Sequence, residues 1–243
     1  MRFSLSGKTA IVTGGGSGIG HAIVEALTEQ GATVHILDLA GEGPYTHHCD
    51  VTQQDQVKQV VDSIARGGRI DILINNAGIG FVGNLEQTTE EDLDRLYAVN
   101  IKGVYNCALA CVPHMKAHGG VILNMASIGS SVALADRFAY SMSKGAVLTM
   151  TYSIAKDYLA YGIRCNSISP ARVHTSFVDN FIAKNYPGRE EEMFAKLAAS
   201  QPIGRMAQPR EVADLAVYLC SDEAAFATGT DFPIDGGFIK LNG

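Results

Sequence analysis

Apolar stretches rich in β-branched residues alternate with amphipathic stretches along nearly the whole chain, and this alternation constrains the fold more than any other feature. Such an order is typical of a parallel β-sheet with helices on both faces. Strands are expected at Thr9–Thr13, Thr33–Asp38, Thr46–Asp50, Ile70–Asn75, Gly120–Met125, Ile163–Ser169 and Asp231–Ile234. Helices are expected at Gly18–Glu29, Gln53–Ala65, Thr89–His118, Phe138–Tyr161 and Pro209–Cys220. The chain is therefore predicted to be an α/β protein with a doubly wound sheet of about seven parallel strands.

Nothing in the chain marks a boundary between domains. The sequence has 243 residues, of which 47% are hydrophobic and 18% charged, as in ordinary globular proteins. No linker or repeat divides it, so we expect residues 1–243 to form a single domain. Leu39 to Tyr45 is too short for a helical crossover and predicts a tight loop. Residues 174–206 form a long non-periodic region, which predicts a substrate lid.

Charge and cysteine content exclude several classes of protein. The formal net charge of -6 offers no basic face to nucleic acid or to anionic lipid. The only apolar run near Met1 is too short for a membrane span, so a cytoplasmic protein is expected. Five cysteines without a C-x-x-C pair indicate a reducing compartment. We expect no disulfide and no metal site; Cys107 and Cys111 are interpreted as core residues, and the neighbouring His47 and His48 would point to opposite faces of a strand.

A glycine-rich turn stands between the first predicted strand and the first predicted helix. Gly14, Gly18 and Gly20 give the spacing G-x-x-x-G-x-G, with Ser17 and Ile19 between them. Glycines let the backbone turn sharply and bring a helix N-terminus close to a pyrophosphate. A plain tight turn is the alternative. The glycine-rich turn stands after a predicted strand and before a predicted helix, and this position favours a dinucleotide site.

An acidic residue ends each of the next two predicted strands. Asp38 can accept hydrogen bonds from both hydroxyls of an adenosine ribose and would repel a 2′-phosphate. No lysine or arginine lies in the glycine turn or directly after Asp38, so NAD is predicted rather than NADP. Asp50 is a candidate for the adenine amino group, with a structural cap as the alternative.

Further polar residues follow the predicted fourth and fifth strands. Asn75 to Gly78 follows the fourth strand and Ser127 the fifth, and ligands of open α/β sheets bind at such carboxyl ends. Tyr140 and Lys144 lie one helical turn apart, so a cation is close enough to act on a phenol. Taken singly, each of these residues has a purely structural explanation, such as a helix cap or a packed ring.

Together these residues resemble the short-chain dehydrogenase/reductase family, and the resemblance extends over essentially the whole chain. The matching motifs are the glycine turn, Asn75 to Gly78, Asn100, Ser127, Tyr140 with Lys144, and Asp235 to Gly237. It implies a Rossmann-type fold, a homotetramer, and a catalytic group of Asn100, Ser127, Tyr140 and Lys144. The implied cofactor-binding residues are Gly14, Ser17, Gly18, Ile19, Gly20, Asp38, Asp50, Val51, Asn76, Ala77, Gly78, Tyr140, Lys144, Pro170, Val173 and Thr175.

The chemistry of a tyrosine agrees with these roles. Lowering the pKa of a phenol from near 10 to ~7 requires about 4 kcal/mol, which Lys144 and the positive nicotinamide of NAD⁺ would supply together. Tyr140 would then take the proton of an alcohol, and Ser127 would hold the substrate oxygen. Asn100 would help to hold a water through which the proton reaches solvent.

Arginines suggest which substrate is bound. Arg137 lies three residues before Tyr140 and Arg205 at the end of the predicted lid, so both are candidates to bind a carboxylate. Solvated surface arginines are the alternative. The sequence Pro170-Ala171-Arg172 stands where the family usually has Pro-Gly, so Arg172 and His174 are further candidates to contact the substrate. A contact of Arg172 with the cofactor or with a neighbouring subunit is the alternative.

The lid and the C-terminal segment resemble family members that oxidise sugar acids in L-fucose breakdown. A keto-deoxy sugar acid such as 2-keto-3-deoxy-L-fuconate is the expected substrate. A 3-hydroxybutyrate-type dehydrogenase, a 3-oxoacyl reductase and a non-catalytic NAD-binding protein are the alternatives. The predicted helices from Thr89 and from Phe138 are apolar beyond one face, which fits packing against a second subunit or burial under loops.

Overall fold

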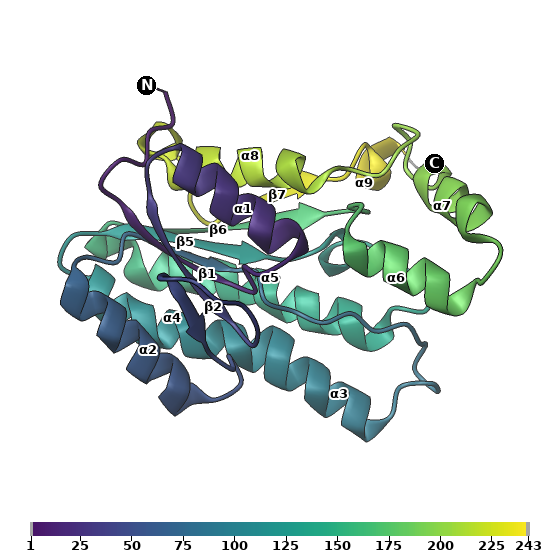
Figure 1. Ribbon diagram of the computed structural model, residues 1–243, viewed down its shortest axis with the longest axis horizontal. Coiled ribbons are helices and arrows are strands. Elements are labelled where there is room, and N and C mark those ends of the chain that lie inside the picture. The colour runs from purple at the N-terminus through teal and green to yellow at the C-terminus, as the bar shows by residue number, and fades with distance from the viewer. Residues whose placement is uncertain (1, 242–243) are drawn as a thin grey trace.

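A single seven-stranded parallel sheet forms the centre of the computed structural model, and helices cover both of its faces (Figure 1). The structure describes residues 2–241, apart from the side chains at positions 177, 181 and 185; Met1 and residues 242–243 of the predicted domain lie outside this range. The strand order is β3-β2-β1-β4-β5-β6-β7. The order reverses between β1 and β4, which is the switch point where ligands of doubly wound sheets bind. The predicted Rossmann-type fold is confirmed.

The central strands are buried on both faces, as all-parallel sheets require. The strands are β1 (Thr9–Thr13), β2 (Thr33–Asp38), β3 (Thr46–His48), β4 (Ile72–Asn75), β5 (Gly120–Met125), β6 (Ile163–Pro170) and β7 (Asp231–Ile234). Val12 of β1 pairs with Ile36 on one side and Ile74 on the other. The strands at 46 and 70 are shorter than predicted, because the chain turns away into the loops that follow β3 and precede β4.

Two hydrophobic cores lie on opposite faces of this sheet. On one face pack α1 (Gly18–Glu29) and α8 (Pro209–Cys220), which lie side by side above the sheet in Figure 1. On the other face pack α2 (Gln54–Gly67), α4 (Gly103–Met115) and α5 (Phe138–Tyr158). Short 3₁₀ turns follow at Ile128–Ser130, Leu159–Tyr161 and Asp222–Ala224, and the tight loop expected at 39–45 is present.

One long predicted helix, Thr89–His118, is divided in the structure. It consists of α3 (Glu90–Leu96), a six-residue π-helical segment at Tyr97–Lys102, and α4. A π-helical turn adds a residue to the ordinary spacing, and such turns are frequent at functional sites. The segment contains Asn100, which is completely buried.

The predicted lid region contains two helices, α6 (Ser176–Asn185) and α7 (Glu190–Ala199). Both project beyond the carboxyl ends of the strands, on the right in Figure 1, and the short C-terminal helix α9 (Phe238–Leu241) lies near α7. The switch point of the sheet therefore faces a wall made by the last third of the chain.

Candidate active site

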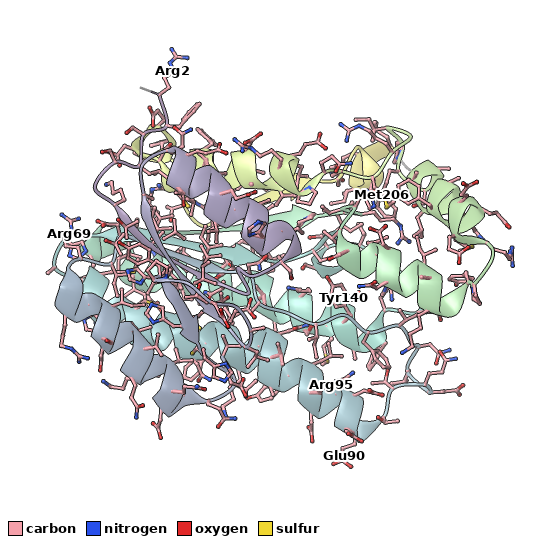
Figure 2. All side chains as sticks on the ribbon, viewed as in Figure 1. Arg2, Arg69, Glu90, Arg95, Tyr140 and Met206 are labelled. Carbon is pink, nitrogen blue, oxygen red and sulfur yellow. The ribbon has the colours of Figure 1, made fainter. Side chains whose placement is uncertain are left out.

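A cavity of about 1130 Å³ lies at the carboxyl ends of the strands, below the lid helices. All sixteen residues predicted to bind the cofactor line it, and so do Ser127, Arg137 and Arg172 among those predicted to bind substrate. Tyr140 and Met206, two lining residues labelled in Figure 2, lie in the right half of the view, the half in which α6 and α7 also lie. Three candidate residues, Asn100, His174 and Arg205, do not line this cavity.

The glycine turn is shaped by close contacts with the end of β4. Gly14 has a left-handed φ of 64°, and a Cβ there would lie 2.9 Å from the Cα of Ala77. A Cβ on Gly20 would collide with the carbonyl oxygen of Gly14. Asn76 Nδ2 donates to the carbonyl oxygens of Thr13 and Gly14, both at 3.0 Å. A side chain at either glycine would therefore push the turn away from β4.

The helix after this turn begins without a side-chain cap. Ser17 is the N-cap residue of α1, yet its hydroxyl makes no capping hydrogen bond, and the first turn contains no acidic side chain. The open N–H groups and the positive end of the helix dipole favour an anion at this point. The residues present thus fit the pyrophosphate of a dinucleotide.

Asp38 lies at the rim of the cavity with a fixed carboxylate. Its Oδ2 accepts a hydrogen bond of 2.9 Å from Gly16 N–H, and its Oδ1 accepts one of 3.3 Å from Ala40 N–H. A Cβ on Gly16 would lie 3.0 Å from Oδ2. Asp50 also lines the cavity, and its Oδ1 accepts a hydrogen bond of 2.9 Å from Thr52 N–H in the loop before α2, whose N-cap residue is Gln53.

Tyr140, Ser127 and Lys144 lie together at the base of the cavity. Tyr140 and Lys144 are on the first turns of α5, and Ser127 follows β5. Burial raises the pKa of the Tyr140 phenol, while a hydrogen bond with Ser127 and the positive charge of Arg137 act to lower it. The phenol is therefore in hydrogen-bond contact with the hydroxyl that is predicted to hold the substrate oxygen.

The ammonium group of Lys144 is held by a backbone carbonyl. Its Nζ donates a hydrogen bond of 2.7 Å to Met125 O, and burial lowers its pKa to about 8. The cation that lowers the pKa of Tyr140 in this structure is Arg137, and the pKa is raised overall because burial outweighs that charge. The sequence places Lys144 near Tyr140 but does not show that its ammonium group is held by a backbone carbonyl.

Asn100 lies behind the cavity and joins three segments. Its Oδ1 accepts from Ile79 N–H at 2.8 Å, and its Nδ2 donates to Ile79 O and to Ser143 Oγ, each at 3.0 Å. A Cβ on Gly78 would lie 3.3 Å from Asn100 Oδ1 and 3.4 Å from Lys144 Nζ. Gly78 thus lets the loop after β4 approach both side chains closely.

Arg137 and Arg172 line the cavity together. Arg137 Nη1 donates to Phe81 O at 3.0 Å, and Arg172 Nε donates to Ser200 Oγ at 3.0 Å. Burial lowers the pKa of the half-buried Arg172, and the positive charge of Arg137 lowers it further, so the two cations act on each other. Among the described residues, neither guanidinium has a carboxylate partner.

Arg205 is placed elsewhere. It makes two hydrogen bonds of 2.7 Å to the carboxylate of Glu211, and it lines a separate cavity of about 130 Å³. The two residues are held there because Glu211 also accepts from the backbone N–H of Gln208, where α8 begins. Contrary to the sequence prediction, the structure does not bring Arg205 to Tyr140. His174 is also engaged outside the cavity, at 2.8 Å from Asp179 Oδ1.

Several lining residues carry no motif and were not predicted. Five large apolar side chains line the cavity: Phe81, Leu134, Leu197, Met206 and Phe238. Ser200 and Gln201, directly after α7, add polar atoms. Phe238 follows the recognisable Asp235-Gly236-Gly237, which is a signal that could have found it, whereas nothing in the sequence distinguishes Ser200 or Gln201 from other lid residues.

Comparison with known proteins identifies the family. A family model described as enoyl-(acyl carrier protein) reductase matches residues 14–239. The dehydrogenase/reductase SDR family member 6 of Danio rerio is 39% identical, over 96% of this chain and 98% of its own. The chain therefore belongs to the short-chain dehydrogenase/reductase family, and it is an oxidoreductase of the kind that acts on CH–OH groups.

Solved structures agree with this assignment. The aldohexose dehydrogenase of Thermoplasma acidophilum, in ligand-free form, is 36% identical with a TM-score of 0.92, over 98% of this chain and 96% of its own. A protein of Beutenbergia cavernae described as an NAD(P)-dependent gluconate 5-dehydrogenase, with NADP bound at low occupancy, is 29% identical with a TM-score of 0.89, over 98% and 99%. No helix of the described residues is both long and apolar enough to cross a membrane.

Proposed function

We propose that this enzyme interconverts the secondary alcohol and the ketone of a small carboxylated substrate, a hydroxy acid or a keto-deoxy sugar acid. The observation that carries the proposal is the pair Arg137 and Arg172, which line one cavity without a carboxylate partner. Two neighbouring guanidinium groups repel each other, and burial makes the repulsion more costly. A bound carboxylate relieves both effects and accepts hydrogen bonds from the arginines.

We further propose NAD as the cofactor. The Asp38 carboxylate stands at the end of β2, where it can accept hydrogen bonds from ribose hydroxyls and would repel a 2′-phosphate. The glycine turn, the uncapped start of α1 and Lys144 fit the pyrophosphate and the nicotinamide ribose. A bound nicotinamide supplies the hydride acceptor for oxidation, or the donor for reduction.

Each side chain of the site then has one part in the reaction. Ser127 holds the oxygen of the reacting carbon by a hydrogen bond, and Tyr140 takes the proton from that oxygen or returns it. Arg137 and Arg172 bind the carboxylate and so fix which carbon faces Tyr140. Asn100 positions Ile79 and Ser143 behind the site. We expect Tyr140→Phe to lower kcat by about 100- to 10,000-fold with the fold intact.

The test is the reduction of NAD⁺ and of NADP⁺, followed at 340 nm, with hydroxy acids, sugar acids and their neutral amides. We expect NAD⁺ and carboxylated compounds to be preferred. Arg172→Met and Arg137→Met should raise KM for the acids far more than for the amides, and Arg66→Met, on the exposed face of α2, is the control. Equal turnover of an acid and its amide would contradict the proposal.

Within this class of substrates, a short hydroxy acid such as 3-hydroxybutyrate is the alternative to a sugar acid. The apolar wall of Leu134, Leu197, Met206 and Phe238 favours it, because a methyl-bearing substrate would bury apolar surface there. The same panel separates the candidates by the ratio of kcat/KM for 3-hydroxybutyrate and for a sugar acid.

We also propose that copies of this chain associate through α4 and α5, in a homotetramer. Tyr105 and Leu109 of α4 and Met142 and Tyr152 of α5 are each more than 40% exposed. Exposed apolar helix faces of this kind are typical of subunit interfaces.

A further inference from the structure

Gln201, whose side-chain amide oxygen is buried and unpartnered among the described residues, lines two neighbouring cavities. Gln201 lines both the main cavity and the small one beside it, and the residue is only 3% exposed. Its Oε1 has no hydrogen-bond partner among the described residues. Leaving a buried acceptor unpaired costs about 1–3 kcal/mol, so native proteins rarely do it without a reason.

The orientation of this amide is fixed by Ser200. Ser200 Oγ donates its single hydrogen to Leu197 O at 2.6 Å. The same oxygen must then accept its other two contacts, from Arg172 Nε and from Gln201 Nε2, both at 3.0 Å. Gln201 Nε2 is therefore committed to Ser200, and the other end of the amide is an acceptor.

Because Gln201 Oε1 is a hydrogen-bond acceptor, it can bind only a group that donates a hydrogen. A carboxylate is an acceptor itself and would be repelled by the amide oxygen, whereas Arg172, joined to Gln201 through Ser200, attracts it. The partner of Gln201 Oε1 must carry a hydrogen. In a substrate made of carbon, hydrogen and oxygen, that group is a hydroxyl close to the carboxylate.

We propose that Gln201 accepts a hydrogen bond from a second substrate hydroxyl, distinct from the one that is oxidised, and that the enzyme is thereby selective for polyhydroxy acids. This inference rests on the proposed function, because it names the class of acid that Arg137 and Arg172 bind. Ser200 acts as a positioning residue, since it orients both Gln201 and Arg172.

The test compares 3,4-dihydroxybutanoate with 3-hydroxybutanoate, which lacks the second hydroxyl, and a 2-keto-3-deoxy sugar acid with its analogue lacking one further hydroxyl. Both kcat/KM and the dissociation constant in the presence of NADH, from NADH fluorescence, are measured for each pair. A compound that is not turned over is still compared by binding. The variants are Gln201→Leu and Gln201→Met, with Gln59→Leu on the exposed face of α2 as the matched control.

We expect the wild type and the control to prefer the more hydroxylated member of at least one pair by about tenfold or more, and both Gln201 variants to lose that preference. Affinity for NADH alone should stay unchanged. Ser200→Ala should weaken the preference and also raise KM for all acids, whereas Ser200→Thr, which keeps the hydroxyl, should restore both. Equal binding within every pair by the wild type, a preference that survives in Gln201→Leu, or a main effect on NADH affinity would each overturn the inference.

Failure of the proposed function gives a different result. If 3-hydroxybutanamide is used as well as the acid, and Arg172→Met changes neither, the carboxylate proposal is wrong. A hydroxyl preference that still disappears in Gln201→Leu would then leave Gln201 as a hydroxyl-binding residue for a neutral polyol. The two ratios, acid to amide and hydroxylated to deoxy, report on the two proposals separately.

Discussion

The phenol of Tyr140 is subject to two opposing influences, because burial raises its pKa while Ser127 and Arg137 act to lower it. Oxidation of an alcohol requires the deprotonated phenol as base, so the rate of oxidation should rise with pH through that pKa. Removing the charge in Arg137→Met should raise the pKa further and move the midpoint to higher pH. The profile of kcat/KM against pH, measured with a neutral alcohol, checks this, and Arg66→Met should leave the midpoint in place. A midpoint that stays or falls in Arg137→Met would show that Arg137 does not act on the phenol.

Lys144 should reduce the stability of the fold while it serves the site. Burial lowers its pKa to about 8, against 10.5 for an ordinary lysine. Below pH 8 both the folded and the unfolded chain hold the proton, so the full cost of burying the charge applies, about 3 kcal/mol at most. Between pH 8 and 10.5 only the unfolded chain still binds the proton, so the free energy of unfolding of the wild type rises with pH relative to Lys144→Met.

The expected result for Lys144→Met is therefore a loss of activity with a gain of stability that is largest below pH 8. Loss of the hydrogen bond to Met125 O offsets part of the gain. Urea unfolding of both proteins at pH 7 and at pH 9.5 measures the difference. If Lys144→Met is less stable than the wild type at pH 7, the buried charge of Lys144 does not destabilise the fold. A difference in the free energy of unfolding that widens with pH would contradict the prediction as well.

At single positions, the sequence could place in one cavity those residues whose position depends on local order. The glycine turn, Asp38, Asn76 and the pair Tyr140 and Lys144 each follow a strand or share a helix turn, so spacing alone brings them to one cavity. Arg205 was assigned to the same place wrongly, because its position depends on how the lid loop meets α8 and Glu211. Gln201 and Ser200 were missed for the same reason.

At the scale of elements, the π-helical segment Tyr97–Lys102 directs Asn100 toward the loop after β4. Hydrophobic periodicity did not predict this segment, because six residues are too few to show a period of their own. The division into α3 and α4 was therefore read as one helix. The lid region was also interpreted as non-periodic, since α7 buries only Met193 and shows a weak amphipathic pattern.

Asn100→Ala should show how far this segment supports the site. The change leaves the N–H and C=O of Ile79 and the hydroxyl of Ser143 without their partner, which should lower the free energy of unfolding by about 1–3 kcal/mol. Activity should fall as well, because Ile79 lines the cavity. Asn166→Ala is the control, since Asn166 is equally buried but bonds to Ala227 O far from the cavity. A similar loss of activity in both variants would show that Asn100 affects activity only through the stability of the fold.

At the scale of the whole molecule, the cavity combines parts of the chain that are distant in sequence. Its floor comes from the ends of β1, β2, β4 and β5, and its wall from the region after β6 and from α9. The strand ends belong to the dinucleotide-binding part of the fold. They follow the general rule that ligands of open α/β sheets bind at the carboxyl ends of strands, so the sequence could predict them. The region after β6 and α9 differ between proteins of one fold and determine which substrate binds. Their residues in the cavity could therefore be identified only from the structure.

The proposed association through α4 and α5 extends this argument to a second copy of the chain. Leu109 is 48% exposed on α4, one helical turn from Tyr105, so a charge at Leu109 would be buried in the interface but solvated in a free protomer. We expect Leu109→Glu to shift the molar mass measured by light scattering toward the protomer and to lower the melting temperature in a concentration-dependent way. Leu85→Glu, at a residue 66% exposed outside α4 and α5, should keep the assembly. Because α5 also holds Tyr140 and Lys144, loss of the interface should reduce activity together with mass. Full assembly in Leu109→Glu would place the interface on another face of the molecule.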